Sequence, residues 1–100
     1  MKIMRGIAYG VLLMGMAAGA QAGDAAAGKA KSMSCMACHG AAGISANDIW
    51  PNLAGQKKGY LAKQIKAFRD GTRNDPMMAP MVKALTDADI EDIATYYSGL

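Results

Sequence analysis

The segment Cys35-Met36-Ala37-Cys38-His39 is the part of this chain whose residue types and spacing most directly indicate a chemistry. Two cysteines separated by two residues and followed at once by a histidine form the attachment motif of a c-type haem. Each thiol can add across one vinyl group of the porphyrin, and the adjacent imidazole can then take an axial position on the iron. The motif therefore predicts one covalently attached haem c, bound through Cys35 and Cys38 and ligated by His39.

Three other interpretations of these residues remain open: a Cys35–Cys38 disulfide, a thioredoxin-like redox pair, and half of a zinc site. A zinc site would need two further ligands, whereas the chain has one histidine and no other cysteine. A thioredoxin-like pair would need a βαβ context, and the sequence shows no strand pattern. Haem attachment is the favoured interpretation, so the rest of the chain is expected to build a haem pocket.

Residues 1–22 have the pattern of a cleaved signal peptide. Lys2 and Arg5 precede the apolar stretch 7–18, and Ala20-Gln21-Ala22 presents small residues at the two positions that a signal peptidase requires. We therefore expect cleavage before Gly23, export to the periplasm, and no stable membrane anchor in the mature chain. Export also fits the motif, because both cysteines must remain available to haem outside the reducing cytoplasm.

The mature chain, residues 23–100, is short enough to form one small domain, and domains of this size usually need additional stabilisation, for example from a bound cofactor. Without Lys2 and Arg5 it has nine basic residues against eight acidic ones. This near-neutral balance gives no support to nucleic-acid binding, so the expected partners are other redox proteins.

The pattern along residues 23–100 predicts an all-α domain with three main helices and two long loops. The first helix spans 24–36, with Asp24 as its N-cap, and the loop 40–55 follows the haem motif. The second helix spans 57–70, with Leu61, Ile65 and Phe68 on one apolar face. The loop 71–85 follows it, with Pro76 and Pro80 each expected to exclude helix. The last helix starts after Thr86, which has Asp89 at capping-box spacing, and carries an apolar stripe through Ile90, Ile93, Ala94 and Tyr97.

On these motifs the mature chain resembles a class I cytochrome c, and more closely the short bacterial mono-haem cytochromes of the c4/c5/c553 type. The resemblance rests on the haem motif, on Trp50-Pro51-Asn52-Leu53-Ala54-Gly55-Gln56, on Met77-Met78-Ala79-Pro80-Met81, and on Leu85 before the last helix. It implies the small cytochrome c fold, wrapped around one covalently bound haem. It also implies a contact between Gly28 and Tyr96 where the first and last helices cross, although periodicity favours burial of Tyr97.

The resemblance implies a methionine as the second axial ligand of the iron. In that family the ligand lies in a proline-containing loop seven residues before the leucine that opens the last helix, which in this chain is Met78. Met77 and then Met81 are the alternatives, since the remaining methionines can also simply fill gaps around the ring. The family also implies that the Pro51 carbonyl accepts a hydrogen bond from His39, although Pro51 can equally be an ordinary turn residue.

The expected function is that of a periplasmic electron carrier, because a six-coordinate iron has no free site for a substrate. The alternative is the cytochrome subunit of a periplasmic dehydrogenase complex, such as a sulfide-oxidising flavocytochrome. An open-site haem enzyme or gas sensor is disfavoured by the methionine cluster. Five basic residues on the second helix, Lys57, Lys58, Lys63, Lys66 and Arg69, either steer partners by charge or only solvate that helix.

Overall fold

The computed structural model describes residues 23–100, and within that range it contains helices and no strand, which confirms the predicted all-α class. In chain order the helices are α2 (Ala25–Lys31), α3 (Met33–His39), α4 (Lys58–Asp70), α5 (Met78–Val82) and α6 (Asp87–Ser98). The predicted signal peptide, residues 1–22, lies outside the described residues. None of the helices in residues 23–100 is long and apolar enough to span a bilayer.

The predicted first helix is divided into two by Ser32. The Asp24 side chain caps α2 by accepting hydrogen bonds from the backbone N–H groups of Ala26 and Ala27. The Ser32 hydroxyl donates a hydrogen bond to the Lys29 carbonyl oxygen at 2.8 Å. It thereby competes with the backbone N–H that would bond to this carbonyl in a continuous helix. The chain then turns and re-enters helix as α3. The predicted end of the helix at residue 36 is therefore wrong, because the haem motif itself is helical and His39 ends α3.

The loop that was predicted over 71–85 contains the short helix α5, so the expectation that Pro80 excludes helix is wrong. Pro80 is the third residue of α5, where a backbone N–H would have no carbonyl partner within the helix in any case. Asp75 supplies the missing N-terminal acceptor, because its Oδ1 lies 2.8 Å from the Met77 nitrogen and 3.1 Å from the Met78 nitrogen. The methionine cluster is thus held on a helical turn.

The last helix follows its prediction closely. The Thr86 hydroxyl accepts from the Asp89 nitrogen at 3.1 Å, and the Asp89 carboxylate accepts from the Thr86 nitrogen at 3.0 Å, which completes the capping box. The predicted stripe on α6 forms the centre of the core, together with Leu61 and Ala62 of α4. This packing places α4 and α6 behind the haem motif.

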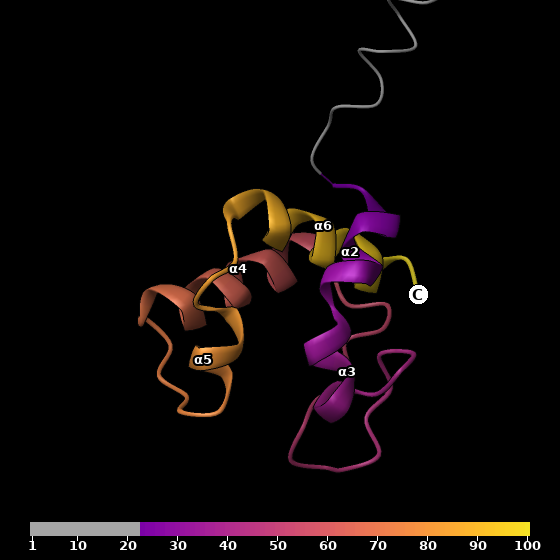
Figure 1. Cartoon of the computed structure of the whole chain (residues 1–100). Coiled ribbons are helices and arrows are strands. Elements are labelled where there is room, and N and C mark those ends of the chain that lie inside the picture. Colours follow the sequence, from indigo (N-terminus) through magenta and orange to yellow (C-terminus); the bar gives the residue numbers. More distant parts are fainter. Residues whose placement is uncertain (1–22) are drawn as a thin grey trace, which may run out of the picture.

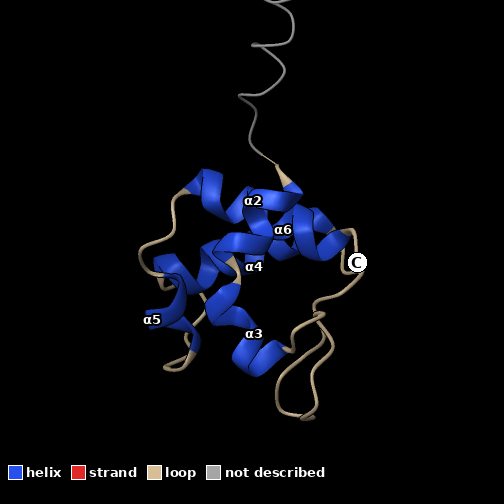
Figure 2. Ribbon diagram, turned by 45° about the vertical axis from the view of Figure 1, so that its right-hand side comes forward, coloured by secondary structure: helices blue, strands red, loops and turns tan. Residues whose placement is uncertain are grey.

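The crossing of α2 over α6 depends on Gly28. A Cβ built on Gly28 would lie 1.9 Å from the Asp92 carbonyl oxygen and 2.9 Å from the Tyr96 Cβ, so only glycine allows the two backbones to approach this closely. Tyr96 provides this contact, while Tyr97 on the next position is the fully buried ring at 1% exposure. Figures 1 and 2 show α2, α4 and α6 together, with α3 and α5 extending from them on one side.

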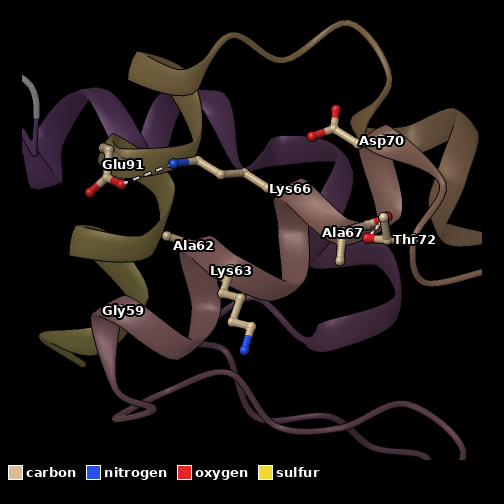
Figure 3. A pocket seen from close by; sticks show the side chains of 8 residues that line it. All are labelled: Gly59, Ala62, Lys63, Lys66, Ala67, Asp70, Thr72 and Glu91. Atoms are coloured by element: carbon tan, nitrogen blue, oxygen red, sulfur yellow. Dashed lines mark hydrogen bonds and ion pairs between the residues drawn. The ribbon is translucent and has the colours of Figure 1, made fainter.

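The basic residues of α4 face acidic residues of α6. Lys58 and Lys66 place their ammonium nitrogens 3.7 Å from the carboxylate of Glu91, and Arg69 Nη1 lies 2.8 Å from Asp87 Oδ1. Figure 3 shows Lys66 reaching Glu91 over a shallow hollow of about 450 Å³, while Lys63 projects away from that carboxylate. Three of the five cations are thus paired within the fold, and the charge asymmetry of α4 is smaller than the sequence suggests.

Candidate functional site

A largely apolar cavity of about 610 Å³ lies between α3, α4, α5 and the loop 40–55. This volume falls within the range of about 300–1,000 Å³ that is usual for small-molecule and cofactor sites. The cavity brings together every residue that the sequence analysis assigned to the site, namely Cys35, Cys38, His39, Pro51, Met77, Met78 and Met81. Residues from three separate segments therefore converge on one space.

Helix α3 presents the two thiols to this cavity. Cys35 and Cys38 are three residues apart on one helix and thus lie on the same face, and both are half-buried free thiols that line the cavity. Burial raises the pKa of the Cys35 thiol. At Gly40 a Cβ would lie 1.9 Å from the Ile44 carbonyl oxygen, and the φ of +90° also suits only glycine, so the chain can turn sharply directly after His39.

The His39 ring is buried, at 7% exposure, and its orientation is fixed by the loop that follows. Its Nδ1 lies 2.8 Å from the Pro51 carbonyl oxygen. A peptide carbonyl only accepts hydrogen bonds, so Nδ1 carries the proton and Nε2 keeps its lone pair. An imidazole held in this way by a backbone carbonyl is oriented to ligate a metal through Nε2.

The three methionines of the 77–81 segment differ in burial. Met77 and Met81 are each 56% exposed, whereas Met78 is partly buried in the cavity wall. The hydrogen bond from the Met78 nitrogen to Asp75 Oδ1 fixes the start of α5 and with it the position of this side chain. Met33, by contrast, is 67% exposed, and neither it nor Met36 lines the cavity.

The cavity is also lined by polar residues that the sequence analysis did not assign, among them Tyr60, Gln64 and Arg73. Tyr60 and Gln64 lie beside the apolar stripe of α4. The periodicity of the sequence identified that stripe but not these two polar neighbours. Arg73 follows α4, lies over the Phe68 ring at 4.4 Å, and donates to Gln64 Oε1 at 2.8 Å. It is the one lysine or arginine that lines the cavity among residues 23–100. Nothing in its local sequence distinguishes it from the other basic residues.

The cavity fits a haem. Its lining is mostly apolar, it provides two thiols and one oriented imidazole on one wall, and it provides thioethers on another. Tyr97 lines it as well, and its buried hydroxyl has no hydrogen-bond partner among the described residues, although Ser32 and Cys35 are polar neighbours. Burial raises the pKa of Tyr97 to about 12, so it stays a neutral donor. The donor set and the apolar lining therefore suit this cofactor.

The class of protein follows from this match between cavity and cofactor: a small helical domain that encloses a covalently held haem is a c-type haem protein. The family model for cytochrome c matches residues 25–100, and the chain belongs to the cytochrome c family. Its cofactor is therefore haem c, and it is an electron carrier and not an enzyme.

Individual relatives agree with this assignment. Cytochrome c-554(548) of Halomonas halodenitrificans is 54% identical over 80 residues, which cover 77% of this chain and 96% of that protein. The thiosulfate dehydrogenase electron acceptor of Thiomonas intermedia is 45% identical over 76 residues, 75% of this chain but 35% of that protein. The solved structure of Acidithiobacillus ferrooxidans cytochrome c4 matches with a TM-score of 0.74 and 36% identity, over 82% of this chain and 52% of that one. The chain thus spans nearly all of the first relative and about half or less of the others.

Proposed function

We propose that this chain is a periplasmic carrier that exchanges one electron at a haem attached through Cys35 and Cys38, with His39 and Met78 as the iron ligands. The observation that carries the proposal is the 2.8 Å contact between His39 Nδ1 and the Pro51 carbonyl oxygen. It leaves Nε2 as the ligating nitrogen of a ring that lines the same cavity as the two thiols and Met78. Met77, and after it Met81, are the alternative ligands.

When bound, the haem supplies a one-electron Fe(III)/Fe(II) couple whose potential is raised by a thioether ligand. The residues of this chain hold that couple in a constant environment. The Pro51 carbonyl fixes the imidazole, and the Asp75 carboxylate fixes the start of α5 and so the position of Met78. The apolar wall of α4, with Leu61, Ile65 and Phe68, excludes water from the cavity.

The haem propionates need donors, and the cavity provides a small number of them. The Arg73 guanidinium is the cation at the cavity, and the Trp50 indole is the aromatic donor on the loop 40–55. We assign Arg73 and Trp50 to the propionates, with the Gln64 contact at 2.8 Å holding Arg73 in place.

The periplasmic location rests on the predicted cleavage before Gly23 and on the chemistry of attachment. Haem must meet two reduced thiols in a compartment where free cysteines otherwise form disulfides, which favours an exported chain with a dedicated attachment step.

The second candidate function is that of an electron-accepting subunit bound to a periplasmic dehydrogenase. The relative from Thiomonas intermedia bears the name thiosulfate dehydrogenase electron acceptor, which favours this candidate over the sulfide-oxidising flavocytochrome of the sequence analysis. The loop 40–55 also exposes two large apolar side chains, Ile44 at 58% and Ile49 at 73%. A free carrier purifies alone, whereas an obligate subunit co-purifies with its dehydrogenase.

Covalent attachment and location are tested together by fractionation. The osmotic-shock fraction of cells that express the whole chain should contain a protein that stains for haem after denaturing electrophoresis, at the mass of residues 23–100 plus one haem. Stain should disappear when Cys35 and Cys38 are both replaced by alanine, because no thioether can then form. A haem that extracts from the wild-type protein into acidic organic solvent, or stain confined to the cytoplasm, would contradict the proposal.

A further inference from the structure

The Asp92 carboxylate, which lies on α6, binds the backbone at the predicted start of the mature chain. Asp92 Oδ1 accepts a hydrogen bond from the Gly23 nitrogen at 2.8 Å and another from the Asp24 nitrogen at 2.9 Å. The Asp92 side chain is 8% exposed, so these contacts are shielded from solvent. A carboxylate on the last helix therefore holds the residue that directly follows the predicted cleavage site.

The charges around Asp92 do not balance while Gly23 belongs to a longer chain. Lys31 Nζ lies 2.7 Å from Asp92 Oδ2 and 2.9 Å from Asp89 Oδ1, so one ammonium group serves two carboxylates. Lys31 is the main cause that lowers the pKa of Asp92 and the pKa of Asp89, the latter to about 2. Both acids are therefore ionised at neutral pH, and this cluster has one negative charge in excess.

The conformation at residue 23 is one that only glycine adopts readily. Gly23 has a φ of +87°, and a Cβ built on it would lie 3.2 Å from Lys58 Nζ and 3.3 Å from Thr95 Oγ1. The Lys58 ammonium would repel a positive charge at the Gly23 nitrogen, but it is paired with the Glu91 carboxylate at 3.7 Å. Asp24, the N-cap of α2, is the further acid next to Gly23.

We infer that Asp92 forms a binding site for the α-amino group of Gly23 that signal-peptide removal creates. An amide at Gly23 donates one neutral hydrogen bond to Asp92 Oδ1. After cleavage between residues 22 and 23 the same nitrogen is an ammonium group, and at the same 2.8 Å it forms a charge-assisted hydrogen bond. Two cations, this ammonium and Lys31, then balance the carboxylates of Asp92 and Asp89. Processing thus completes a partly buried ion cluster that joins α2 to α6. The inference rests on the predicted cleavage site and is independent of the redox role.

The test compares haem-loaded protein with two N-termini. The first form is exported from the natural sequence, and the second carries two serines inserted between Ala22 and Gly23, so that Gly23 keeps an amide. Intact mass establishes where each form begins, and urea is used because it does not screen charge. The natural form should have the higher urea midpoint, with a folding equilibrium constant larger by on the order of tenfold. The reduction potentials of the two forms should agree.

Two matched variants show whether the difference in urea midpoint arises from the Asp92 binding site. In Asp92→Asn the two forms should unfold at the same urea concentration, whereas in Asp87→Asn, which removes an exposed acid of the same helix, the difference should persist. If Asp92→Asn does not fold, the pKa of the wild-type α-amino group, measured by NMR titration, replaces it and should lie above the ordinary value of about 8. Equal midpoints for the two wild-type forms, an unshifted α-amino pKa, or a mature chain that begins elsewhere than Gly23 would overturn the inference.

Discussion

Replacing Met78 with alanine should abolish the weak long-wavelength absorption band that arises from methionine sulfur bound to ferric iron. The reduction potential should fall by on the order of 100 mV or more, because axial ligands set haem potentials over a range of about 0.8 V. The physical reason is the loss of the soft thioether that stabilises Fe(II). The visible spectrum of the oxidised protein and a redox titration measure the two effects.

The neighbouring methionines supply the controls for this prediction. Met77 and Met81 line the same cavity but are 56% exposed, so Met77→Ala and Met81→Ala should keep the band and shift the potential only slightly. A band that disappears in Met77→Ala and survives in Met78→Ala would place the ligand one residue earlier. The attachment of the haem should be intact in all three variants, because the thioether bonds involve α3 alone.

Replacing Gly28 with alanine should destabilise the folded protein by about 3 kcal/mol or more, at the upper end of what overpacking costs. The new Cβ would lie 1.9 Å from the Asp92 carbonyl oxygen and 2.5 Å from the Asp92 carbonyl carbon, both of which are backbone atoms that cannot turn aside. The crossing of α2 over α6 would have to open, and the melting temperature of a domain this small should fall by more than about 10 °C. Thermal unfolding followed by circular dichroism measures the loss.

Gly59 offers a matched control on another helix. It is the second residue of α4, it is exposed, and a Cβ built on it meets nothing within 4 Å. Gly59→Ala should therefore be neutral or stabilise the protein by up to about 1 kcal/mol, since alanine restricts the unfolded chain more than glycine does. Equal losses in Gly28→Ala and Gly59→Ala would show that the helix crossing is not the cause.

The sequence was sufficient wherever the deciding contact lies within a few residues. The spacing of Cys35, Cys38 and His39 predicts haem attachment without reference to the fold, because one helical turn places both thiols on the same face. The capping box of Thr86 and Asp89 likewise joins residues three positions apart, and the start of α6 was predicted correctly from it. Periodicity also identified the faces of α4 and α6 that form the core.

The tertiary structure decided what depends on distant or competing partners. The break at Ser32 follows from a side chain that competes for a helix carbonyl, and the helix around Pro80 follows from the acceptor that Asp75 provides. Arg73 lines the cavity because the turn after α4 folds back over Phe68 and Gln64 of that helix. Asp92 binds the Gly23 nitrogen from 69 positions away, a contact that no local pattern in the sequence indicates. Spacing along the chain determines local chemistry, but only the packing of helices determines which charges and carbonyls meet across that distance.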